Sequence, residues 1–163
     1  MYVFSLRFLA YVQVVKNFSA NITLSLGASP IMSEAPLECP ALANIPSPHS
    51  VVLNLGTLTP DLFVAYHTAL FEYNSAGWPV ILDPVGAGAT KFRADATAEC
   101  LEKGYCDVIK GNLGEIMAVA GWKGGKSRGV DSLDIGNLDD RCRLASYLAQ
   151  RERSITIRSR LTY

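Results

Sequence analysis

Residues 79–92 read Pro-Val-Ile-Leu-Asp-Pro-Val-Gly-Ala-Gly-Ala-Thr-Lys-Phe. The apolar residues 80–82 predict a short buried strand that ends at Asp83, because the proline that follows cannot donate to a strand ladder and biases its predecessor away from helix. The two glycines beyond it let the backbone approach a ligand closely. Ligands of open α/β sheets bind beyond the carboxyl ends of the strands, so this segment predicts a phosphate–metal site. The other interpretation is an ordinary turn, since Asp, Pro and Gly are common turn residues.

The bulk composition describes a globular domain with no charge bias. The chain has 163 residues, enough for one domain (residues 1–163) with a sizeable core. Lys plus Arg equals Asp plus Glu at 15 each, and no basic stripe occurs, which argues against a nucleic-acid partner. Hydrophobic residues make up 49% of the chain, so we do not expect disorder.

The cysteines and the first residues of the chain indicate in which cellular compartment to expect the protein. No cysteine pair or flanking histidine has metal-ligand spacing, so we expect reduced thiols rather than a disulfide framework or a zinc site. Residues 1–15 are apolar but interrupted by Arg7 and Gln13, too short to span a membrane and without the features of a signal peptide. We therefore expect a cytoplasmic protein with no membrane partner.

Strand and helix patterns alternate from residue 51 onward. Thr59 as N-cap and Pro60 at the first helical position open one helix, and Gly77 ends it. Alternation with short loops predicts an α/β fold with a mostly parallel sheet and right-handed crossovers. The expected strands cover residues 51–55, 80–82, 108–109 and 155–157, and the other expected helices cover 94–103, 115–119 and 138–151.

Three of the expected strand exits carry polar or glycine-rich segments. They are Gly56 and Thr57, Asp83, and the Lys-Gly-Asn run at residues 110–112. Since parallel strands end at the same edge of a sheet, a carboxylate, a cation and exposed backbone donors should meet in one crevice. By contrast, Gly-Gly-Lys-Ser at residues 124–127 lacks the upstream glycine and the leading strand of a P-loop, and we interpret it as a surface turn.

Four segments together carry a family resemblance. They are residues 17–32, with Gly-Ala-Ser-Pro-Ile-Met at their end, Asn-Leu-Gly-Thr at 54–57, Asp-Pro-Val-Gly-Ala-Gly-Ala-Thr at 83–90, and Lys-Gly-Asn-Leu-Gly-Glu at 110–115. In order and spacing they resemble hydroxyethylthiazole kinase, of the ribokinase-like superfamily, over roughly residues 14 to 150. The Lys-Gly-Asn variant and the loop at 127–132 look most like the kinase half of fungal bifunctional thiamine-phosphate synthases.

The resemblance implies a fold, an activity and partners. It implies a ribokinase-like three-layer fold and ATP-dependent phosphorylation of 4-methyl-5-(2-hydroxyethyl)thiazole, a salvage step in thiamine biosynthesis. ATP and Mg²⁺ are the implied cofactors. In the family, active sites lie at subunit interfaces, so the resemblance also implies a homo-oligomer.

The resemblance also implies roles for individual residues on the substrate and nucleotide sides. Met32 matches the family residue that contacts the thiazole, and Gly56 and Thr57 lie on the substrate side with it. Lys110 takes the place of an arginine that binds ATP phosphate in many members, and Asn112 is implied beside it. Lysine keeps the positive charge but loses the bidentate fork of arginine.

Two acids complete the implied site. Asp83 and Glu115 match the pair placed near Mg²⁺ and the phosphates, with Asp83 also on the nucleotide side. Mg²⁺ prefers one or two carboxylates together with phosphate oxygens and water, which makes this assignment physically sensible. The structural alternatives are a surface ion pair at a helix start for Lys110 and Glu115, and core packing for Met32.

The end of the chain departs from the family pattern. There the family carries a Thr-Gly pair that contacts ATP and, much later, a Gly-x-Gly-Cys turn whose backbone amides stabilise the transferring phosphate. This sequence reads Arg-Ser-Arg-Leu-Thr-Tyr at residues 158–163. We therefore expect a C-terminally truncated kinase domain that encodes no catalytic anion hole, has negligible catalysis, and exposes apolar surface prone to aggregation. The alternatives are a non-catalytic remnant that binds thiazole or joins oligomers, and another ribokinase-like small-molecule kinase.

Overall fold

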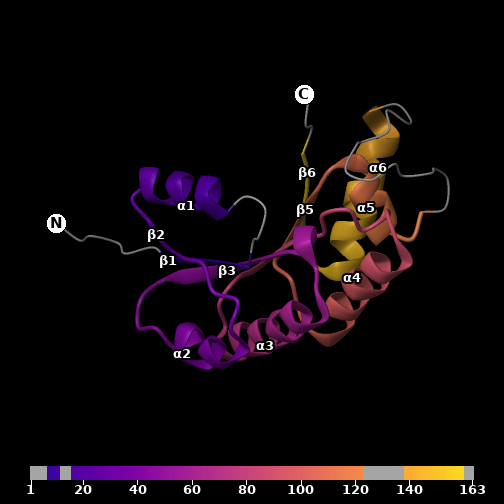
Figure 1. Cartoon of the computed structure of the whole chain (residues 1–163). Coiled ribbons are helices and arrows are strands. Elements are labelled where there is room, and N and C mark those ends of the chain that lie inside the picture. Colours follow the sequence, from indigo (N-terminus) through magenta and orange to yellow (C-terminus); the bar gives the residue numbers. More distant parts are fainter. Residues whose placement is uncertain (1–6, 12–15, 123–137, 160–163) are drawn as a thin grey trace.

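A single parallel sheet organises the chain (Figure 1). The computed structural model describes residues 7–11, 16–122 and 138–159. Six strands lie in the order β2-β1-β3-β4-β5-β6, and all five neighbouring pairs are parallel. The predicted α/β fold with a mostly parallel sheet is thus confirmed. The strands are β1 (Arg7–Tyr11), β2 (Ser29–Ile31), β3 (His49–Asn54), β4 (Val80–Asp83), β5 (Val108–Gly111) and β6 (Ile155–Arg158).

Helices flank the sheet in two layers. Figure 1 shows α1 on one side of the sheet and α2 and α3 on the other, and α3 to α6 contact one another in chain order. The described elements therefore form three layers, with α1 alone on its side. The helices are α1 (Lys16–Ser25), α2 (Cys39–Ala43), α3 (Pro60–Ala76), α4 (Lys91–Lys103), α5 (Leu113–Val119) and α6 (Leu138–Glu152), with short 3-10 turns η1 (Pro36–Glu38) and η2 (Leu55–Thr57).

Capping residues set where the helices begin. Thr59 caps α3 as predicted, its Oγ1 accepting from the Leu62 N–H at 3.2 Å, and Gly77 ends that helix in the left-handed conformation. Helix α4 begins at Lys91, three residues before the predicted start, because Thr90 provides the N-cap. Helix α5 likewise begins two residues before its predicted start, because the preceding asparagine caps it.

The core lies between the sheet and the layer that begins with α2 and α3. Val51, Leu53, Val80, Leu82 and Ile109 are fully buried, and they alternate with side chains on the opposite face. That opposite face carries a row in register across four strands, formed by Val52, Ile81, Val108 and Ile155. The first three are partly exposed and Ile155 is 63% exposed.

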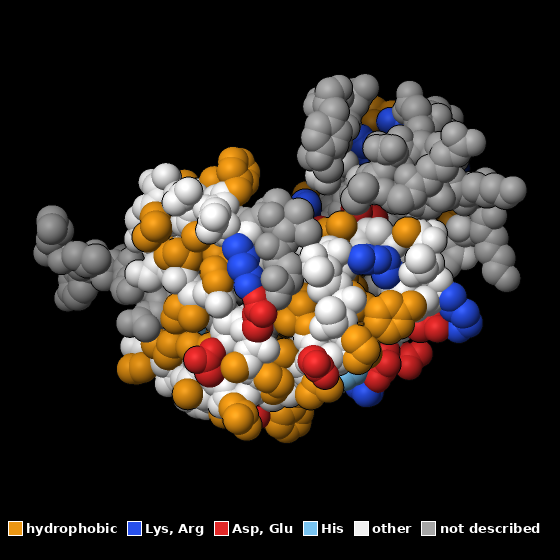
Figure 2. Space-filling model, viewed as in Figure 1, with side chains coloured by type: hydrophobic (Ala, Val, Ile, Leu, Met, Phe, Trp, Pro, Cys, Tyr) orange, Lys and Arg blue, Asp and Glu red, His pale blue; other side chains and the backbone are white. Residues whose placement is uncertain are grey.

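Further apolar surface lies on α1, which buries only Thr23. Phe18 and Leu24 are exposed there, and Figure 2 shows hydrophobic side chains among polar ones in this part of the surface. The structure thus has exposed apolar side chains on a strand and a helix at opposite ends of the sheet.

Strands β1 and β2 were not predicted. The pattern of residues 1–15 predicts no strand, yet Arg7–Tyr11 pairs with both β2 and β3. A five-residue strand with an arginine at its start gives little local signal, and its place is set by its neighbours. The Gly-Gly-Lys-Ser segment at 124–127 and most of the predicted loop at 121–137 lie outside the described residues.

Candidate functional site

Asn54, Asp83 and Lys110 meet at the carboxyl ends of three adjacent strands, β3, β4 and β5. Asn54 Nδ2 donates to Asp83 Oδ2 at 2.7 Å, and Lys110 Nζ lies 3.3 Å from each Asp83 oxygen. The Asp83 side chain is 14% exposed and that of Lys110 is 41% exposed. The structure therefore brings together the predicted carboxylate and cation, and adds an asparagine whose contact with Asp83 was not predicted.

Asn54 is held rigidly at this exit. Its Oδ1 accepts from the Gly56 N–H at 2.9 Å, and its backbone carbonyl accepts from the buried Tyr66 hydroxyl at 2.6 Å. Burial raises the pKa of the Tyr66 phenol well above its usual range, so this group remains a donor. A Cβ on Gly56 would lie 2.8 Å from Asn54 Oδ1, which explains the glycine that opens this turn.

Glu115 connects the glycine-rich loop to the start of α5. Its Oε1 accepts from the Gly86 N–H at 3.0 Å, and its Oε2 accepts from the Asn112 N–H at 2.8 Å. Asn112 Oδ1 in turn accepts from the Glu115 N–H at 2.9 Å, which completes a capping box. Asn112 thus has a structural role as helix cap, and the loop after β4 is fixed to the helix after β5.

The interpretation of Lys110 and Glu115 as a surface ion pair is wrong. Glu115 is only 5% exposed, and Lys110 pairs with Asp83 instead. Burial raises the pKa of the Glu115 carboxyl, and the charge of Asp83 raises it further, while the two backbone hydrogen bonds and Lys110 oppose the shift. A buried acid beside a second carboxylate is a common feature of functional sites.

The residues predicted to face the substrate lie on the β2 and β3 side. Met32 directly follows β2 and is partly exposed, and it is not among the residues of the described hydrophobic core. Gly56 and Thr57 lie in η2, two residues beyond Asn54. Thr57 is exposed and lines a hollow of about 630 Å³, together with Glu34, Pro36, Thr59, Asp61, Leu62 and Val64. Met32 does not line this hollow.

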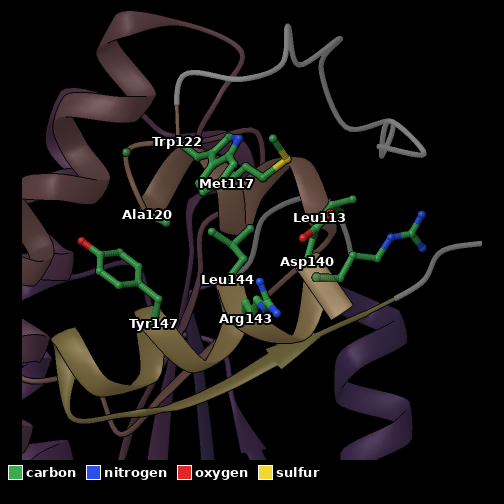
Figure 3. Close-up of a pocket in the computed structure, with 10 residues that line it drawn as sticks. Leu113, Met117, Ala120, Trp122, Asp140, Arg143, Leu144 and Tyr147 are labelled. Atoms are coloured by element: carbon green, nitrogen blue, oxygen red, sulfur yellow. The ribbon is translucent and has the colours of Figure 1, made fainter. Parts of the chain in front are cut away.

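A second cavity lies between α5 and α6. It measures about 570 Å³, and Figure 3 shows Met117 and Trp122 on one wall with Leu144 and Tyr147 on the other. Asp140, Arg141 and Arg143 contribute its polar groups. None of the predicted site residues lines this cavity.

The described part of the chain has no ready-made metal cage, because no three His, Cys, Asp or Glu side chains cluster there. Mg²⁺ uses one or two carboxylates with phosphate and water, so Asp83 and Glu115 fit it without such a cage.

Among the helices of residues 16–122 and 138–159, none combines the length and hydropathy needed to cross a bilayer. Of the four free cysteines, Cys142 alone is exposed.

Sequence reasoning missed Asn54, Tyr66 and Arg93, the last of which donates to backbone carbonyls of the segments that follow β3 and β4. Asn54 stands at a strand exit, as Asp83 does, and this shared position was the available signal. Tyr66 and Arg93 reach the site from helices, through contacts that span 12 and up to 38 residues. No local pattern indicates such contacts.

The strand order defines the class of protein. The described sheet is doubly wound, and its order reverses between β1 and β3, beside Asn54 and Gly56. Such α/β domains bind ligands at this switch point, beyond the carboxyl ends of the strands.

Comparison with known proteins identifies the family within that class. The model of the hydroxyethylthiazole kinase family matches residues 11–160, and the chain belongs to this family. Hydroxyethylthiazole kinase of Pyrococcus horikoshii is 43% identical over 144 residues, which cover 88% of this chain and 52% of that protein. The enzyme of Archaeoglobus fulgidus is 49% identical over 119 residues, covering 73% of this chain and 43% of the relative.

A solved structure agrees. The structure of the Pyrococcus horikoshii hydroxyethylthiazole kinase protein superimposes with a TM-score of 0.79 at 33% identity, covering 96% of this chain and 56% of that one. This confirms the predicted family and its ribokinase-like fold. The chain spans about half the length of the curated relatives it matches.

Proposed function

We propose that this chain takes part in the ATP-dependent phosphorylation of the hydroxyl group of 4-methyl-5-(2-hydroxyethyl)thiazole, a reaction of thiamine biosynthesis. The observation that carries the proposal is the cluster of Asn54, Asp83 and Lys110 at three adjacent strand exits. Family membership supplies the chemistry with which this cluster is consistent.

Lys110 and Asp83 are the residues we assign to the phosphates and the metal. In phosphoryl transfer, catalysis consists mainly of positioning and charge neutralisation, and a bound Mg²⁺ would supply part of the positive charge. Lys110 is the more exposed member of its ion pair with Asp83. Its ammonium can therefore turn to phosphate oxygens while Asp83 retains its hydrogen bond from Asn54. Asp83 would then hold the metal.

Glu115 and Asn112 support this arrangement from the start of α5. Each oxygen of Glu115 already accepts one backbone N–H, yet a carboxylate oxygen can accept a second contact. We assign Glu115 to the metal side through charge and ordered water, and Asn112 to the nucleotide side at the start of α5. Gly56 and Thr57 would receive the thiazole alcohol beside the same cluster, with Met32 contacting its ring.

Product formation and binding test this proposal together. The purified chain is incubated with ATP, Mg²⁺ and the thiazole alcohol, phosphorylated product is measured, and calorimetry records the binding of each ligand. In keeping with the weak catalysis expected from the sequence, we expect only a low yield of product, which depends on both ATP and Mg²⁺, and a further strong loss of product in Lys110→Met. Lys91→Met is the matched control, because Lys91 is 88% exposed on α4 and pairs only with Asp95 in the described residues.

The other outcomes separate the alternatives. Binding of the thiazole alcohol without product would identify a thiazole-binding protein that does not catalyse, and would refute the kinase proposal for this chain. Absence of both product and binding in a folded sample would refute any role for the cluster with these ligands. Assembly into a homo-oligomer stays a prediction, which sedimentation analysis would check.

A further inference from the structure

Arg93 of α4 connects the loops that follow two different strands. Its Nη1 donates to the carbonyl of Leu55 and, at 3.0 Å, to that of Val85, and its Nη2 donates to the carbonyl of Gly56 at 2.8 Å. Leu55 and Gly56 follow β3, whereas Val85 follows β4. One guanidinium thus joins the two exits on which the proposed site is built.

The shape of the guanidinium suits this task. Its planar fork presents several donors in fixed directions, which a lysine ammonium cannot reproduce. Among the described residues, no carboxylate pairs with Arg93, so its charge is met by backbone carbonyls alone. Hydrogen bonds from a charged donor are roughly twice as strong as neutral ones, so three of them should restrain both loops.

The neighbouring loop is built around this side chain. Gly86 has φ of +68°, and a Cβ there would lie 3.5 Å from Arg93 Cδ, so the loop passes close to the arginine stem. The Gly86 N–H also donates to Glu115, which holds the loop from its other side. Arg93 and Glu115 therefore fix the loop after β4 between the turn after β3 and the start of α5.

We propose that Arg93 is a positioning residue, which holds the Gly56–Thr57 turn and the Val85–Gly88 loop at a fixed separation across the site. The turn is the proposed place of the alcohol, and the loop follows the proposed metal-binding carboxylate. Arg93 thereby sets the distance between the two reacting partners. The ligands in this inference rest on the proposed function, but the clamp itself rests on the contacts of Arg93 alone.

Hydrogen exchange of individual amides tests the clamp without requiring activity. In Arg93→Met, which keeps an unbranched apolar stem, exchange at the amides of Gly56, Val85 and Ala87 should accelerate by at least about tenfold, since several charged hydrogen bonds are lost. Amides in the centre of β4 and β5 should keep their rates. Arg93→Lys should give an intermediate acceleration, and the control Lys91→Met, in the first turn of the same helix, should give none.

Two results would overturn the inference. Unchanged exchange at the three loop amides in Arg93→Met would show that the loops do not need the clamp. Equal acceleration at the loops and in the strands of both Arg93 variants would show a general structural role instead. Where the chain phosphorylates the alcohol, Arg93→Lys should lower kcat more than it raises KM. Failure of the proposed function appears as no turnover by the unsubstituted chain, and it leaves the exchange result unaffected.

Discussion

Asp83→Asn separates a structural role of this side chain from a functional one. The substitution keeps the size of the side chain and one acceptor oxygen, but it removes the negative charge. The carboxylate now makes two kinds of contact, a hydrogen bond from Asn54 Nδ2 at 2.7 Å and an ion pair with Lys110 Nζ at 3.3 Å. The cost to stability can be assessed contact by contact.

Both losses are small. The ion pair has a partner that is 41% exposed, and pairs of this kind contribute about 0.2–1 kcal/mol. The hydrogen bond from Asn54 survives to a neutral oxygen, so about 1 kcal/mol of its charge-assisted part is lost. We therefore expect the free energy of unfolding to fall by about 1–2 kcal/mol. The affinity for Mg²⁺–ATP should fall by at least about tenfold, the lower limit for groups that support a metal site.

Urea unfolding and calorimetry of Mg²⁺–ATP binding measure the two quantities on the same samples. Asp95→Asn is the control, because Asp95 is an exposed carboxylate on α4 that also pairs with a lysine. It should change neither quantity appreciably. A loss of more than about 3 kcal/mol in Asp83→Asn, with the nucleotide affinity unchanged, would identify a buried structural pair and refute our assignment.

Three further substitutions test the surroundings of the site. Because the pKa of Glu115 is raised in the folded state, the unfolded chain releases this proton at lower pH than the folded chain does. The stability of the wild type relative to Glu115→Gln should therefore fall as pH rises from about 4. Urea unfolding at several pH values measures this difference, and a rise in the relative stability of the wild type would contradict the prediction. Tyr66→Phe removes the donor to the Asn54 carbonyl and should lower the free energy of unfolding by about 1–2 kcal/mol; no loss would mean that the bond is dispensable. Ile155→Ser should reduce aggregation measured by light scattering while changing stability by no more than about 0.5 kcal/mol, and equal aggregation would place the cause elsewhere.

The elements with local signals were predicted from the sequence. Thr59 followed by proline marks a helix start whatever surrounds it, and the structure has the cap where the pattern indicated. The strand at 80–82 ends at Asp83 because of the proline, and the polar exits of β4 and β5 do lie side by side. Hydrophobic periodicity and turn residues sufficed for the helix start and the strand end, because the interactions that decide these two features span four residues or fewer.

Long-range contacts were not accessible in the same way. Lys110 and Glu115 are five residues apart, and an ion pair between them is one interpretation of the sequence, yet Lys110 pairs with Asp83, 27 residues away. Glu115 is turned inward by the amide of Gly86, 29 residues away. Burial and strand register decide which of two carboxylates pairs with a lysine, and local sequence spacing encodes neither of them.

The polar contacts at the strand exits form one connected set. Tyr66 holds the end of β3, Asn54 joins that end to Asp83, and Arg93 joins both exits through backbone carbonyls. A carboxylate that binds a cation, as we propose for Asp83, has to keep its position when Lys110 turns from it to a phosphate. A neutral partner such as Asn54 suits this role, because it orients Asp83 without cancelling its charge. The glycine-rich loop at residues 86–88 is therefore best understood with its anchors: Arg93 and Glu115 hold the loop in place, as the site we propose for a ligand beside its backbone requires.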